Sequence, residues 1–137
     1  MKKFWPLMAI VAFLGVATLA LPNQQNRLMI NDLETECRGD RVEMTQISLQ
    51  GDNSLRFNGH FPVENTNSNL NIDYKGGVNV VLNIKSQSVP APEFLWHDCL
   101  ASGVYDLKTE PLKKGRYSVE VRHNGERVEK RIIQVKN

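Results

Sequence analysis

Few residues in this 137-residue chain could act as nucleophiles, bases or metal ligands, and their spacing forms no catalytic motif. The histidines are His60, His97 and His123, and no HxH or HExxH spacing links them. His60 falls on the polar face of an alternating strand and His123 flanks a turn, so we expect both at the solvated surface. His97 and Asp98 are neighbours, and neighbours in an extended strand point to opposite faces. The sequence therefore favours a protein that is not an enzyme, with no cofactor and no metal site.

The two cysteines, Cys37 and Cys99, are the remaining reactive side chains. Exported chains with two cysteines usually pair them, and we expect one intramolecular disulfide here. Closing a loop of this length is worth about 4 kcal/mol through the entropy of the unfolded chain. Two free buried thiols, or a disulfide to a partner chain, are the alternatives. Two cysteines are too few for a structural zinc site.

The N-terminus has the composition of a targeting segment over residues 1–22. Lys2 and Lys3 precede an uncharged run of 19 residues, Phe4 to Pro22. As a helix this run would be about 28 Å long, close to the thickness of a bilayer core. It can be a signal peptide cut after Thr18-Leu19-Ala20, which we favour, or a retained membrane anchor. Either choice predicts an extracytoplasmic domain, which is secreted, periplasmic or membrane-anchored facing outside.

Charge is balanced over the remainder of the chain but unevenly distributed. Removing Lys2 and Lys3 from the 17 basic residues leaves 15, equal to the 15 acidic residues. A neutral domain has no overall attraction for nucleic acid, so no nucleic-acid partner is expected. Residues 23–107 contain 6 basic and 11 acidic residues, whereas residues 108–137 contain 9 basic and 4 acidic residues.

Alternating apolar residues predict an all-β domain over residues 37–137, preceded by a polar tether over 23–36 in which Leu28 to Ile30 could start a strand. Strands are expected near 41–50, 54–63, 70–74, 78–84 and 99–107. A change of phase between Met44 and Ile47 predicts a bulge, and Gly76-Gly77 predicts a hairpin turn. With no helical pattern after residue 22, we expect about seven strands in an antiparallel β-sandwich.

The C-terminal region contains the clearest structural signal. Tyr117, Val119 and Val121 alternate, and Asn124-Gly125 is typical of a type I′ turn, in which both residues have positive φ. A regular hairpin around this turn places Val121 opposite Val128 and Tyr117 opposite Ile132. It also brings together two pairs of opposite charge: Glu120 with Arg127, and Arg122 with Glu129.

The run LKKGRYSVEVRHNGERVEKRIIQV, residues 112–135, resembles the closing hairpin of immunoglobulin-like and fibronectin-type-III-like domains of exported microbial proteins. The shared motif is Gly-x-Tyr-x-Val followed by a tight hairpin. The resemblance implies a β-sandwich and no particular activity, because such folds host many functions. Trp96 lies only three residues before Cys99, which departs from the antibody-type spacing.

The segment 86–98 is the main candidate for recognition. Pro90 and Pro92 reduce the entropy cost of ordering it, and Phe94 and Trp96 could anchor a partner protein. Alternatively, these aromatic residues only cap the end of the sandwich. Lys130 and Arg131 are candidates for protecting an edge strand. We therefore expect a non-catalytic interaction module of the cell surface, the periplasm or an envelope complex. A small secreted hydrolase inhibitor acting through this segment is the alternative.

Overall fold

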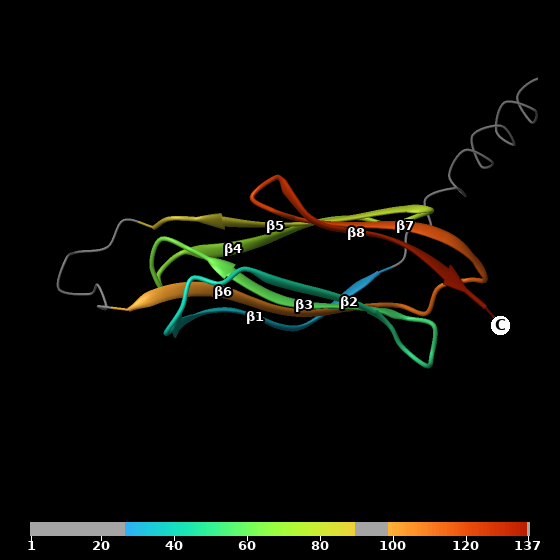
Figure 1. The fold of residues 1–137 in the computed structure, drawn as a ribbon, viewed down its shortest axis with the longest axis horizontal. Coiled ribbons are helices and arrows are strands. Elements are labelled where there is room, and N and C mark those ends of the chain that lie inside the picture. Colours follow the sequence, from blue (N-terminus) through green and yellow to red (C-terminus); the bar gives the residue numbers. More distant parts are fainter. Residues whose placement is uncertain (1–26, 90–98, 137) are drawn as a thin grey trace, which may run out of the picture.

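The computed structural model describes residues 27–89 and 99–136, which form eight strands and no helix (Figure 1). In chain order the strands are β1 (Leu28–Arg38), β2 (Met44–Leu49), β3 (Leu55–Pro62), β4 (Asn69–Lys75), β5 (Asn79–Gln87), β6 (Leu100–Thr109), β7 (Gly115–His123) and β8 (Glu126–Val135). The order in one sheet, here called sheet A, is β1-β6-β3-β2, and the order in the other, sheet B, is β4-β5-β7-β8. The predicted all-β fold is therefore confirmed, with one strand more than expected.

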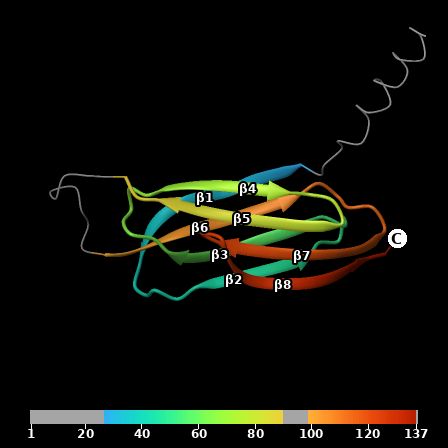
Figure 2. The ribbon, with the colours of Figure 1, turned by 90° about the horizontal axis from the view of Figure 1, so that it is seen from above.

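The two sheets stack face to face as the layers of a sandwich (Figure 1). Seen from above, β4 lies over β1 at one side and β8 lies over β2 at the other (Figure 2). The chain crosses between the layers after β3, β5 and β6. The prediction of an antiparallel sandwich is wrong for one pair of strands, because β5 and β7 pair in parallel from Asn79↔Ser118 to Ile84↔His123. The other neighbouring strands are antiparallel.

Alternation along the strands explains the core between the layers. In β5, Val80, Leu82 and Ile84 are fully buried, while the residues between them face outward. Phe57, Phe61, Tyr105 and Leu107 cover the inner side of sheet A. Apolar side chains at every second position therefore supply the burial that holds the layers together.

Strand β1 corrects the prediction of a tether over 23–36 and of a domain that begins at residue 37. Residues 28–38 form a strand that pairs with β6 from Leu28↔Thr109 to Arg38↔Leu100. A register shift between Ile30 and Asp32 interrupts its alternation, which is why the apolar residues show no regular period. The expected disulfide, Cys37–Cys99, is present and joins the end of β1 to the residue before β6.

Two details of register also differ from the predictions. Strand β2 pairs with β3 without interruption, so the bulge predicted between Met44 and Ile47 does not form. The change of phase in the sequence arises because Met44 faces outward, whereas Ile47 faces the core. In the last hairpin, a shift between Val121 and Arg122 pairs Val121 with Glu129 and Tyr117 with Ile133. Asn124 and Gly125 have the expected positive φ values of 51° and 84°.

Several predictions lie outside the described residues. These are the targeting segment 1–22 and the candidate binding residues Pro90, Pro92, Phe94 and Trp96, together with His97. Within residues 27–89 and 99–136, no helix could span a membrane.

Candidate functional site

A glycine in the middle of sheet A creates the space for a polar network between the sheets. Gly59 on β3 pairs with Thr45 on β2 and with Tyr105 on β6. A Cβ atom on Gly59 would lie 2.6 Å from the Tyr105 hydroxyl and would clash with the Met44 carbonyl oxygen. Because Gly59 has no side chain, the Tyr105 side chain reaches across β3 to Thr45, with 2.9 Å between the hydroxyl oxygens.

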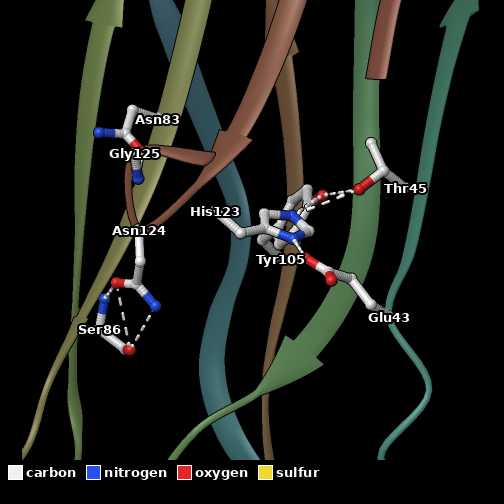
Figure 3. Close-up of polar contacts among 8 residues, drawn as sticks. All are labelled: Glu43, Thr45, Asn83, Ser86, Tyr105, His123, Asn124 and Gly125. Carbon is white, nitrogen blue, oxygen red and sulfur yellow. Dashed lines mark hydrogen bonds and ion pairs between the residues drawn. The ribbon is translucent and has the colours of Figure 1, made fainter. Parts of the chain in front are cut away.

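His123 extends this network from the end of β7 in sheet B (Figure 3). Its Nε2 lies 2.8 Å from the Tyr105 hydroxyl and 3.3 Å from Thr45 Oγ1. Its Nδ1 contacts the carboxylate of Glu43, which lies just before β2. The His123 ring also stacks on Phe61, with 4.5 Å between ring centroids.

The partners define one consistent direction of hydrogen bonding. His123 Nδ1 donates to the Glu43 carboxylate, and because burial lowers the pKa of His123 and keeps the ring neutral, Nε2 is left as an acceptor. The Tyr105 hydroxyl then donates to Nε2 and accepts from the Thr45 hydroxyl. Every polar group in the network is satisfied in this arrangement, with His123 neutral.

Burial keeps the two central groups uncharged near neutral pH. Burial lowers the pKa of His123, and the contact with Glu43 only partly opposes this effect. Burial also raises the pKa of Tyr105 to about 12, with a further contribution from the Glu43 charge. Tyr105 is therefore not available as a phenolate, and it occupies the nitrogen that a general base would need. The network is suited to fastening β2, β6 and β7 together rather than to catalysis.

An open hollow of about 410 Å³ adjoins the network at the side where β2 meets β8. It is lined by Glu43, Met44 and Thr45 from the β2 side and by Val128 and Glu129 from β8. Beside it, the Arg131 guanidinium donates to the Ile47 carbonyl oxygen at 2.9 Å. Arg131 thereby occupies an acceptor on the open edge of β2, and a strand of another molecule could not pair with that acceptor.

The prediction of two surface histidines was wrong. His123 is 4% exposed and His60 is 7% exposed. His60 is flanked by Met44 and Val104 on the neighbouring strands, and its Nδ1 has no hydrogen-bond partner among the described residues. The alternation of Tyr117, Val119 and Val121 continues to His123 and could have indicated that this residue faces the core. Within the described residues, no cluster of three potential ligands could hold a metal ion.

The outer face of sheet B presents a second feature, which we call the basic face. The alternation of buried residues directs six cations outward from its four strands: Lys75, Lys85, Arg116, Arg122, Arg127 and Lys130. Asp73 and Glu120 are the carboxylates that point to the same side. Six cations against two carboxylates leave this face with a net charge of +4.

Ion pairs with carboxylates neutralise only some of the cations on the basic face. Glu120 is bound by Arg122 at 2.6 Å and lies 3.8 Å from Arg127. The pairing of Glu120 with Arg127 was predicted, whereas Arg122 contacts Glu120 in place of the predicted Glu129. Lys85 lies 3.5 Å from Asp73. Lys75, Arg116 and Lys130 form no ion pair with another described residue and are exposed.

The outer face of sheet A has a different electrostatic character. Register and alternation place four carboxylates there, with three cations, which gives a net charge of −1. One of the cations, Arg56, forms a two-point contact with Asp106 at 2.9 and 2.6 Å. The two outer faces of the sandwich therefore differ by five charges, so a charged partner would distinguish them.

Comparison with known proteins identifies no relative for this chain. No family description, curated protein or solved structure matches it. The resemblance to immunoglobulin-like and fibronectin-type-III-like domains therefore remains an expectation, and the function has to be inferred from the molecule.

Proposed function

We propose that this chain is a non-catalytic interaction module of the extracytoplasmic space and that the basic face is its binding surface. The observation that carries the proposal is the net charge of +4 on one broad sheet face that no other described strand covers. The two sheets, the Cys37–Cys99 disulfide and the network around Tyr105 hold the cations on a framework of paired strands. A fixed arrangement of charge lowers the entropy cost of binding a complementary surface.

The extracytoplasmic location rests on two observations. The first is the apolar run from Phe4 to Pro22, behind two lysines. The second is the disulfide, a bond that persists in oxidising compartments and is compatible with export.

Affinity capture of components from the native cell envelope tests whether the basic face is the binding surface. The chain purified from its host would be compared with two variants that each lose two positive charges. R116Q/K130Q removes cations from the basic face, and the matched control R27Q/R41Q removes exposed arginines that lie outside it. We expect an envelope component that is retained by the wild type and the control but lost from R116Q/K130Q. Equal retention by all three proteins would contradict the proposal.

A panel of hydrolases tests the competing function. The inhibitor hypothesis assigns the inhibition to residues 86–98, which contain none of the cations of the basic face, and predicts tight stoichiometric inhibition that R116Q/K130Q does not alter. Our proposal expects no such inhibition. Finding it would replace the interaction module with the inhibitor.

A further inference from the structure

We infer that the ligand of the basic face is an anionic polysaccharide. This inference rests on the proposed function and adds the chemical class of the partner. It depends on where the cations lie, on what fills the space between them, and on which side chains are missing from the face.

Four of the six cations of the basic face lie along the last hairpin. Arg116 and Arg122 lie near opposite ends of β7, and Lys130 and Arg127 lie on β8, opposite Glu120 and Arg122. Arg122 lies six positions after Arg116 along an extended strand, which corresponds to about 20 Å. A linear polymer with repeated negative charges can contact several of these cations at once, and each additional contact releases further counterions.

Small polar side chains fill the space between the charges. Asn79 and Ser118 are register partners on β5 and β7, Gln134 lies opposite Arg116, and Asn71 lies opposite Lys85. Amides and hydroxyls both donate and accept hydrogen bonds, as sugar hydroxyls do. Val81 and Ile132 offer small apolar patches for the C–H faces of sugar rings, and Ile132 is 55% exposed.

The same composition argues against a protein partner as the main ligand. The centres of protein–protein interfaces combine arginine with aromatic residues and methionine, and these large apolar side chains supply most of the buried contact area. Among the outward residues of the four described strands of sheet B there is no aromatic residue and no methionine. A flat, polar, basic surface instead fits a hydrated polyanion.

Binding of dextran sulfate by the purified full chain at low salt tests the inference, with unsubstituted dextran as the uncharged counterpart. We expect dextran sulfate to bind and dextran not to bind. R116Q/K130Q should weaken the affinity about tenfold or more and should make its dependence on salt shallower. R27Q/R41Q should stay within about twofold of the wild type, and unchanged melting curves would show that all variants are folded.

Two further probes separate failure of this inference from failure of the proposed function. These are polyglutamate of matched charge and vesicles containing phosphatidylglycerol. If either binds as tightly as dextran sulfate and is weakened equally by R116Q/K130Q, the polysaccharide assignment is wrong while the basic face remains a binding surface. If every probe binds R116Q/K130Q and R27Q/R41Q with the same affinity, and both variants retain the same envelope components, both proposals fail.

Discussion

At the scale of single residues, Gly59 determines whether the two sheets can share their polar network. We predict that Gly59→Ala lowers the free energy of unfolding by about 3 kcal/mol, because its Cβ would press on backbone as well as on Tyr105. Chemical denaturation measures the change. Gly39→Ala is the matched control, since nothing lies within 4 Å of the added atom. A Gly59→Ala protein as stable as Gly39→Ala would show that the Tyr105 hydroxyl is not held over β3.

His123 links stability to pH. Its folded pKa lies below the unfolded value of 6.5, so the unfolded chain takes up its proton first as the pH falls. The stabilisation from neutral His123 is therefore complete above pH 6.5 and is lost as the pH drops below it, by at most about 1.4 kcal/mol per pH unit.

We predict that His123→Phe, which keeps an aromatic ring beside Phe61, flattens the decline in stability just below pH 6.5. Denaturant melts of both proteins at several pH values provide the comparison. Because His60 and the carboxylates are common to both proteins, the difference between the two curves reports His123 together with its contact to Glu43. Parallel curves would be inconsistent with a buried neutral imidazole at this position.

At the scale of strands, the disulfide fastens an edge strand to its neighbour. We predict that the Cys37→Ser, Cys99→Ser double variant loses about 2–4 kcal/mol of stability but stays folded, since β1 pairs with β6 along its whole length. Trypsin should then cut first at Arg38 or Arg41, beside the end of β1. Mass spectrometry of the non-reduced wild type verifies the bond itself. Two free thiols in exported protein, or unchanged stability of the variant, would contradict this account.

Arg131 protects the open edge of β2 by binding the Ile47 carbonyl. We predict that Arg131→Ala self-associates at lower protein concentration than the wild type, because this acceptor becomes available to another strand. Sedimentation velocity over a concentration series measures the effect. Lys130→Ala also removes one positive charge, but from the outward side of β8, and should self-associate at the same protein concentration as the wild type. If both variants associate equally, net charge rather than the edge contact is responsible.

Strands with regular alternation could be predicted from the sequence, whereas those that depend on distant partners could not. Leu55, Phe57 and Phe61 identified β3, and Asn124-Gly125 identified the last turn, because both signals are local. The bulge near Ile30 concealed β1, since it breaks the period on which the prediction depends. The shift at Val121 escaped detection because a two-residue turn alone implies a regular register.

At the scale of the whole molecule, the sequence revealed an excess of positive charge after residue 107 but not its location. The basic face also needs Lys75 and Lys85, and these reach β7 only through the parallel pairing of β5 with β7. Strand β6, which belongs to the other sheet, lies between β5 and β7 in the sequence, so no local pattern predicts that these two strands pair. The network of Glu43, Thr45, Tyr105 and His123 likewise joins three distant segments of the chain.

Mapping the bound polyanion on the folded chain tests the central claim most directly. Amide chemical shifts of the isotopically labelled protein would be followed during titration with dextran sulfate. We predict that the largest changes cluster on the outward positions of β5, β7 and β8, including Val81, Glu120 and Ile132, while the residues of sheet A stay unchanged. Changes centred on sheet A or on residues 39–49, or no localised changes at all, would contradict the assignment of the basic face as the binding surface.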